Sequence, residues 1–328
     1  MKMKTIRTFL LSAATAVLVS CGTTSTVPLT GRKQTLLVSD EQVLSLSNQQ
    51  YQEYMKSAKA STNATNTAMV KRVGQKLASA VVSYLNQNGL AADAQQYSWE
   101  FNLVQDQQVN AFCMPGGKIV VYEGLLPVTQ NEGSLAIVLG HEIAHAVAKH
   151  SAERLSNEYK NQVGVQILGT VLGNTSEPTQ QLAAIVQSVG GQLWTSGFSR
   201  KQESEADHMG LIFAAMAGYD PQVATTFWQR MAAQGTGCSS LFSDHASDET
   251  RINQIQGWMP EALKYYKGGS TSATSATSQK PFTSVRKRSS EQYECQEKKM
   301  ALPERAGANG TGQASDVLGR QGQAGAHA

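Results

Sequence analysis

The sequence has little net charge and no concentrated run of one sign. Its 328 residues include 28 Lys and Arg against 25 Asp and Glu, which gives a formal net charge of +3. It also has no dense group of basic residues interleaved with aromatic ones, the pattern that marks a nucleic-acid-binding surface. We therefore expect a protein that does not bind nucleic acid. No repeat of the solenoid type is evident either.

Long apolar runs are also missing. The run near the N-terminus, Phe9 to Val19, is too short to cross a membrane comfortably, and it follows a basic start. It ends in LVSC, Leu18 to Cys21, which resembles the lipobox of bacterial lipoproteins. The resemblance implies cleavage after Ser20 and lipid on Cys21. It further implies a protein of the bacterial cell envelope, lipid-anchored in the outer membrane and facing the periplasm. An ordinary secretory signal with an incidental cysteine is the alternative.

Cysteine is scarce, with four residues in the chain. Without Cys21, only Cys113, Cys238 and Cys295 remain. Three thiols cannot all pair within one chain, so one bridge with a free thiol and no bridge at all both stay open. Their spacings do not match a cysteine-based zinc site.

Composition and periodicity divide the chain into four parts. We expect a lipoprotein signal peptide at 1–20, a lipidated polar tether at 21–38, one folded domain at 39–267 and a low-complexity, disordered tail at 268–328. The spacing of apolar residues predicts strands near 97–106 and 116–126. It predicts helices near 39–58, 66–89, 135–159, 198–218, 220–234 and 247–259, with two short ones between 163 and 194.

The stretch LAIVLGHEIAHAVAKH, Leu135 to His150, carries three histidines in an apolar run. On a helix, His141 and His145 lie about 40° apart, so both can bind one metal ion. Glu142 lies about 100° round, from where it can take a proton from a water in an open coordination position. A metal-free helix with surface histidines is the alternative. His150 lies about 180° from His141 and is predicted to be an unrelated surface histidine.

The acidic cluster KQESEADHMG offers a further ligand. Glu203 and Asp207 are four residues apart and share a helix face, whereas Glu205 points elsewhere. One carboxylate can therefore bind the metal while the other holds the free N–H of a histidine ligand. Geometry alone does not decide which of the two touches the metal. A solvated acidic face is the alternative.

Over roughly residues 28–260, the sequence resembles the M48 family of zinc metallopeptidases. The resemblance rests on six pieces in the family's order: PLTGRKQ, NAFCMPGGKIVVYEGLL, HEIAH, ESEAD, GYDP and DHASDETRI. It implies an α+β, mostly helical, zincin-like domain with a small sheet whose edge strand borders the active-site cleft. It also implies one Zn²⁺ per chain.

The resemblance also assigns roles to individual residues. His141, His145 and Glu203 are implied as zinc ligands, Glu142 as general base and Asp207 as the partner of a ligand histidine. His245 falls where the family places a histidine near the metal, to stabilise the oxyanion or to cap the zinc at rest, although an ordinary loop histidine is the alternative. Arg251 has a weaker claim to the same region.

We expect the strand in GGKIVVYEG to be an exposed edge that pairs with an extended substrate, with Asn110, Gly116 and Gly117 binding substrate. An ordinary sheet strand is the alternative. Two residues depart from the family pattern. Cys113 replaces a small apolar residue, which leaves a bridge to Cys238 open, and Ala246 replaces the proline that usually follows the late histidine.

The resemblance implies a zinc-dependent endopeptidase, held at a membrane by lipid on Cys21, that cleaves unfolded, misfolded or misassembled envelope proteins. The alternative is an envelope-protein assembly factor or chaperone with a capped, rarely active zinc. A purely structural zinc site is disfavoured because three ligands beside a glutamate leave an open position, and structural sites are usually closed.

Overall fold

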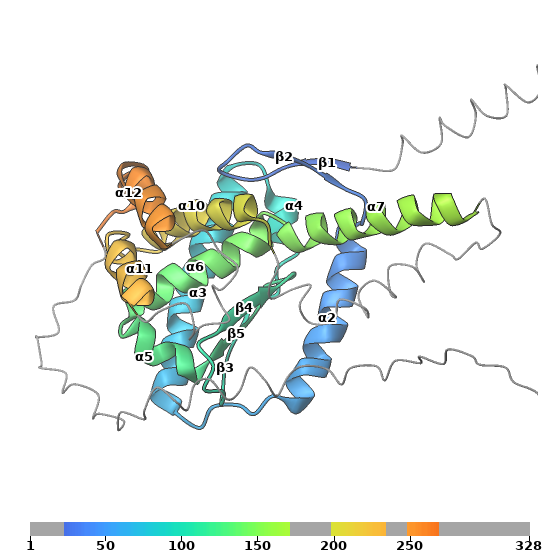
Figure 1. Cartoon of the computed structure of the whole chain (residues 1–328). Helices are drawn as coiled ribbons and strands as arrows, with labels where there is room; N and C mark the ends of the chain where they lie inside the picture. The colour runs from blue at the N-terminus through green and yellow to red at the C-terminus, as the bar shows by residue number, and fades with distance from the viewer. Residues whose placement is uncertain (1–22, 171–197, 234–247, 269–328) are drawn as a thin grey trace, which may run out of the picture. The chain divides into compact units, whose positions relative to one another are not determined.

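The computed structural model describes residues 23–170, 198–233 and 248–268, and these are the residues discussed below (Figure 1). The signal peptide and the tail beyond Gly268 lie outside them. Of the region 163–194, where two short helices were expected, residues 163–170 belong to a longer helix, His150–Thr170, and residues 171–194 lie outside the described part. In the described part, the prediction of a mostly helical α+β fold is confirmed. The strands are β1 (Thr23–Thr26), β2 (Lys33–Leu36), β3 (Glu100–Val104), β4 (Ala111–Met114) and β5 (Lys118–Tyr122).

The helices agree with most of the predicted ranges. They are α2 (Asp40–Ser57), α3 (Ala64–Gln87), α4 (Ala91–Ala94), the 3-10 turn η1 (Glu123–Leu125), α5 (Leu126–Thr129), α6 (Glu132–Val147), α7 (His150–Thr170), α10 (Arg200–Met216), α11 (Val223–Ala233) and α12 (Asp248–Tyr265). Local signals set several of their starts. Ser39 and Ser199 each form a capping box with a glutamine three residues on. No helix in the described ranges is both long and apolar enough to cross a membrane.

The central sheet has the strand order β3-β5-β4 and lies between helices (Figure 1). Strand β5 pairs in parallel with β3 and antiparallel with β4. Ile119 and Val121 pack with α3 and α6, whereas Val120 and Tyr122 pack with α2. All residues of β5 are buried, as expected for a strand covered on both faces.

The prediction that GGKIVVYEG forms the edge strand of the sheet is wrong. The strand in GGKIVVYEG is the central one, with neighbours on both sides, so its backbone groups are already paired. The edge strand that packs against α6 is β4, in the segment NAFCMPGG. Edge position depends on pairing with distant strands, which the alternation of residues within one strand does not reveal.

The segment predicted as a polar tether, 21–38, is instead ordered from Thr23 onward. Strands β1 and β2 form an antiparallel hairpin. Val27, Leu36 and Val38 are buried, and the hairpin packs on the start of α7. The segment is short in apolar residues, but these three anchor it to the domain.

The single helix predicted over 135–159 is two helices. Lys149 adopts a left-handed backbone conformation with φ of 57° and separates α6 from α7. Its ammonium group is 2.7 Å from Asp40 Oδ2 and 2.8 Å from Asp93 Oδ1. Distant carboxylates thus hold the break in place, and no glycine or proline marks it in the sequence.

Helices α6 and α10 contact each other through their backbones. A Cβ added to Gly140 would lie 2.6 Å from the carbonyl oxygen of Gly210, and one added to Gly210 would lie 2.5 Å from the amide nitrogen of His141. Only glycine at both positions permits this approach. The crossing brings the histidines of α6 next to the acidic residues of α10.

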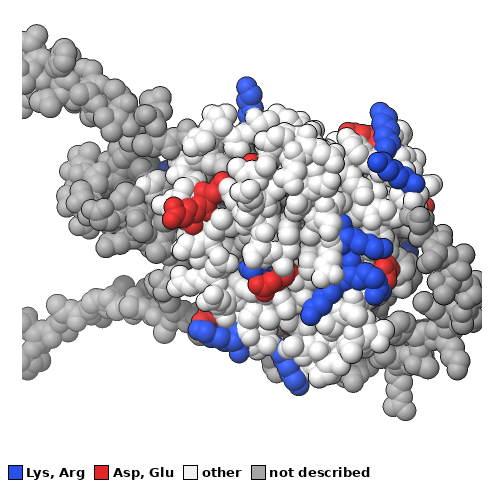
Figure 2. All heavy atoms as spheres, turned by 180° about the vertical axis from the view of Figure 1, so that it is seen from behind, with Lys and Arg blue, Asp and Glu red and all other residues white. Residues whose placement is uncertain are grey.

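Charged side chains on the face shown in Figure 2 form small separate groups among uncharged residues, with both signs present. This view shows no broad basic surface. It agrees with the nearly balanced charge of the sequence.

Candidate metal centre

Three side chains from α6 and α10 converge in the interior. Nε2 of His145 lies 3.1 Å from Nε2 of His141, and Oε2 of Glu203 lies 3.3 Å from the latter and 3.6 Å from the former. All three side chains are buried. Ligands about 2.0–2.1 Å from a tetrahedral zinc lie about 3.3 Å from one another. The spacing and the two-nitrogen, one-oxygen donor set therefore fit zinc, and this is the one such group among the described residues.

Asp207 and Arg251 support His141 from behind. Oδ1 of Asp207 lies 2.8 Å from Nδ1 of His141, which leaves Nε2 of the ring directed toward the group of three. The Arg251 guanidinium donates to the same carboxylate oxygen and lies 3.5 Å above the ring of Trp228. Of the two carboxylates that sequence geometry could not separate, Glu203 faces both metal-side nitrogens and Asp207 the rear of a histidine.

The two histidines differ in their protonation. Burial lowers the pKa of His145 to about 3, against the smaller opposing effect of Glu203, so its ring is neutral at neutral pH. Burial also acts to lower the pKa of His141, but hydrogen bonds and charges from Asp207 and Glu203 outweigh it and raise the pKa to about 9. A neutral imidazole is the form that binds a metal.

Glu142 lies beside His141 and is coupled to the edge strand. Burial, reinforced by the charge of Glu203, raises the pKa of Glu142 to about 7. The charge of His141 and the backbone amide of Cys113 in β4 act in the opposite direction and lower this pKa in part. A carboxylate with this pKa can both take up and give back a proton near neutral pH.

Cys113 carries a buried free thiol. Burial, with a further contribution from Glu142, raises its pKa well above the ordinary value, so the thiol stays protonated and inert. Cys238, the partner in the bridge left open above, lies outside the described residues, as do Cys21, Cys295 and His245. The alternative function, an assembly factor or chaperone whose zinc is capped by His245, therefore concerns a residue outside the described part.

Of the three residues predicted to bind substrate, Gly116 and Gly117 lie in the turn between β4 and β5, and Asn110 lies at the other end of β4. The carbonyl of Asn110 accepts from the amide of Tyr122. Gly116 and Gly117 have φ of 87° and 85°, and a Cβ on Gly117 would lie 2.7 Å from the Trp99 ring. The turn itself thus requires the two glycines. Their role in substrate binding stays a prediction.

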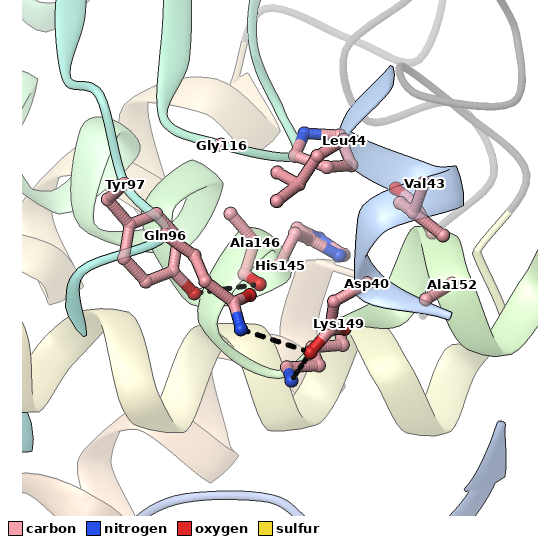
Figure 3. Close-up of a pocket in the computed structure, with 12 residues that line it drawn as sticks. Asp40, Val43, Leu44, Gln96, Tyr97, Gly116, His145, Ala146, Lys149 and Ala152 are labelled. Atoms are coloured by element: carbon pink, nitrogen blue, oxygen red, sulfur yellow. Dashed lines mark hydrogen bonds and ion pairs between the residues drawn. The ribbon is translucent and has the colours of Figure 1, made fainter. Parts of the chain in front are cut away.

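Gly116 also lines a cavity beside His145, together with Leu44 and Tyr97 (Figure 3). The ion pair of Lys149 with Asp40 lies next to it. Its volume is about 30 Å³. This is room for about one water molecule, and it is too small for a large substrate side chain.

The prediction that His150 is an unrelated surface histidine is wrong. His150 is fully buried, and its Nδ1 lies 2.9 Å from Nδ1 of His145. The 180° estimate assumed one continuous helix, whereas the break at Lys149 redirects the chain and turns His150 back toward the site. The sequence carries no local signal for this break.

The fold and the site together define a metallopeptidase of the zincin type: an HExxH helix, a glutamate from a second helix and a small sheet along the first. The profile of peptidase family M48 matches residues 64–259, well over half of the chain. The chain belongs to this family, as the sequence resemblance predicted.

Curated relatives match in the same region. The chain is 40% identical over 167 residues to the mitochondrial metalloendopeptidase OMA1 of Schizosaccharomyces pombe, covering 50% of this chain and 48% of that protein. It is 30% identical over 246 residues to human OMA1, covering 72% and 46%. It is 30% identical over 186 residues to the beta-barrel assembly-enhancing protease of Yersinia pestis, covering 54% and 38%. The chain thus spans about half or less of these relatives.

The predicted localisation, lipid-anchored in a bacterial outer membrane and facing the periplasm, is wrong on this comparison. The OMA1 relatives, with identities up to 40%, are named as mitochondrial, and the bacterial proteases match at 30% and 28%. The composition of the N-terminal segment does not by itself distinguish the two destinations. The first twenty residues are basic, rich in hydroxyl side chains and free of acidic ones, and mitochondrial targeting segments share that composition.

Proposed function

We propose that the chain is a zinc-dependent endopeptidase with His141, His145 and Glu203 as the metal ligands. The convergence of two Nε2 atoms and one carboxylate oxygen within 3.6 Å, next to Glu142, is the observation that carries the proposal. Three protein ligands leave a fourth position for water or substrate, which is the arrangement of catalytic rather than structural zinc.

A zinc ion held there would polarise both a peptide carbonyl and a water molecule. Glu142 takes the proton of that water as its oxygen bonds to the carbonyl carbon, and then gives the proton to the amide nitrogen as the C–N bond breaks. The backbone amide of Cys113 in β4 favours the ionised form of Glu142, which is the form that takes up a proton. Asp207, backed by Arg251, fixes the ring of His141.

We propose that the substrate is an extended segment of a misfolded or misassembled membrane protein. Among the described strands, β4 rather than β5 is an edge strand along α6, paired with β5 alone, so it is the one that can pair with an extended chain. The name of the Yersinia pestis relative, beta-barrel assembly-enhancing protease, supports this substrate class.

The test uses the full chain and an unfolded protein such as casein. We expect the purified protein to contain one zinc, to lose cleavage when a chelator removes it, and to regain cleavage when zinc is restored. Peptide products should have internal cleavage points, as an endopeptidase requires. A chain that holds no zinc after purification and after zinc addition would overturn the proposal.

We propose lipid attachment at Cys21 independently of any compartment, and this proposal rests on the pattern LVSC alone. Labelling with a fatty-acid analogue should mark the wild-type chain and not Cys21→Ser. Equal labelling of the two chains would reject it, and so would no labelling of either.

A further inference from the structure

A chain of buried polar side chains runs from His145 away from the metal centre. His150 lies behind His145, with 2.9 Å between their Nδ1 atoms, and Nε2 of His150 lies 3.0 Å from Oε2 of Glu205. The His150 side chain has no exposed surface, and that of Glu205 is 6% exposed. Neither residue is among the proposed metal ligands, and a solvated surface role is excluded for both.

The direction of each hydrogen bond follows from the metal side. Nε2 of His145 faces His141 and Glu203, so its neutral ring carries the proton on Nδ1. That proton can only be donated to Nδ1 of His150, which must then be an acceptor with its own proton on Nε2. This second proton is donated to the Glu205 carboxylate, which accepts. One tautomer for each ring satisfies the whole chain.

Glu205 is in turn fixed by the N-terminal hairpin. Its Oε1 accepts from the Thr30 hydroxyl at 2.5 Å and its Oε2 from Nε of Arg32 at 2.7 Å. Arg32 also binds Glu153 in α7 with distances of 2.7 and 2.9 Å. The loop between β1 and β2 therefore locks the carboxylate that sets the tautomer of His150.

The two histidines on the metal are supported differently. Away from the metal side, Asp207 contacts the Nδ1 atom of His141 directly, whereas Nδ1 of His145 contacts a second imidazole, which in turn contacts the carboxylate of Glu205. An imidazole accepts only in one of its two tautomers, so the support of His145 works only if Glu205 keeps the proton of His150 on Nε2. Phe198, stacked on His145 with ring centroids 4.2 Å apart, fixes the plane of the ring but not its tautomer.

We propose that His150 is a positioning residue for the metal centre, and that Glu205 and Arg32 hold it in its accepting tautomer. This rests on the proposed zinc site. Replacing a residue that hydrogen-bonds a metal-ligating histidine typically lowers the affinity for the metal 10–100-fold. The affinity of the centre for metal then depends on the docking of the hairpin formed by β1 and β2.

The test measures zinc affinity by chelator competition, and the visible absorption spectrum of the cobalt-substituted full chain. In His150→Ala, the zinc Kd should rise about 10–100-fold, and the cobalt bands should shift. His150→Asn keeps an oxygen acceptor close to the position of Nδ1, so it should recover part of both. Arg32→Gln should weaken binding in the same direction by a smaller factor.

His208→Ala is the matched control. His208 also pairs with a glutamate, Glu261, at 2.7 Å, but it stacks on Trp258 and makes no described contact with the centre. Its Kd and cobalt spectrum should equal those of wild type. Circular dichroism checks that each variant is folded.

The proposal is overturned if His150→Ala binds zinc within twofold of wild type with an unchanged cobalt spectrum. If that variant does not fold, unchanged values for both His150→Asn and Arg32→Gln overturn it as well. Failure of the zinc site itself would look different, because wild type would then bind neither metal. Wild type that binds zinc and cleaves, together with unaffected variants, rejects only the role of His150.

Discussion

Gly140 and Gly210 face each other where α6 and α10 cross, and neither position has room for a single methyl group. A Cβ on Gly210 would come within 2.7 Å of three backbone atoms of Gly140 and His141. Backbone atoms cannot rotate away as a side chain can. The distance between the two halves of the metal centre is therefore set by two residues that make no contact with a metal.

Replacing Gly210 with alanine should push α10 away from α6 and separate Glu203 from the two histidines. Overpacking of this kind costs about 1–3 kcal/mol. We expect a lower free energy of unfolding in urea for Gly210→Ala and the loss of bound zinc after dialysis.

Gly257→Ala is the matched control, because Gly257 lies in α12 with nothing within 4 Å of an added Cβ. Alanine should stabilise that helix by about 0.5–1 kcal/mol and leave the zinc content unchanged. A Gly210→Ala chain that is as stable as wild type and retains zinc would contradict this account. It would show that the contact between Gly140 and Gly210 does not set the distance between Glu203 and the two histidines.

Because Glu203 and Asp207 have separate roles, replacing each of them should lower the affinity for zinc by a different factor. Glu203→Ala removes a ligand and should abolish zinc retention, whereas Asp207→Ala removes the support of His141 and should weaken affinity about 10–100-fold. Metal analysis after dialysis against graded chelator separates the two results. Glu261→Ala is the control: it removes a carboxylate that pairs with His208, away from the metal centre, and it should change neither zinc retention nor zinc affinity. The reverse order of losses would exchange the roles of Glu203 and Asp207.

The ion pair of Arg32 with Glu205 predicts how stability changes with acid. Burial alone would raise the pKa of Glu205, but hydrogen bonds from His150, Thr30 and Arg32 outweigh it and lower the pKa to about 2. A carboxyl group whose pKa is lower in the folded chain stabilises that chain fully above its unfolded pKa of about 4.3. This stabilisation is lost as the pH falls toward 2.

Arg32→Gln removes part of the pKa depression, so the variant should be less stable at pH 7 and lose less stability on acidification. Urea unfolding of the metal-free proteins at pH 7, 5 and 3 measures both effects. Carboxyl groups that do not contact Arg32 cancel in the comparison. Glu153, whose pKa is lowered against the effect of burial by hydrogen bonds that include those of Arg32, changes in the same direction as Glu205. Parallel curves for the two chains from pH 7 to 3 would contradict this role of the pair.

The sequence could predict those parts of the site in which the residues lie on one helix, close together in the chain. His141 and His145, and the pair of Glu203 and Asp207, could be predicted because residues four apart on a helix share a face. Only the resemblance to the M48 family singled out Glu203 as the ligand. The same periodicity predicted most of the helices, whereas the zincin-like α+β fold was predicted from the resemblance to the M48 family.

The remaining features depend on distant contacts. His150 reaches His145 because Asp40 and Asp93 hold Lys149 in a conformation that breaks the helix. Strand β5 is central because β3 and β4 flank it, and the hairpin of β1 and β2 is ordered because a few apolar residues and Arg32 find partners far along the chain. None of these pairings leaves a periodic trace in the sequence.

Glu142→Gln tests the proposed activity most directly, because it removes the proton acceptor and leaves the three ligands in place. The measurement is casein cleavage by wild type and variant at equal, verified zinc content. We predict that the variant binds zinc as wild type does, and that its cleavage rate falls at least about a hundredfold, as expected when a general base is lost. Equal cleavage by the two zinc-loaded chains would contradict the assignment of Glu142 and, with it, the proposed mechanism.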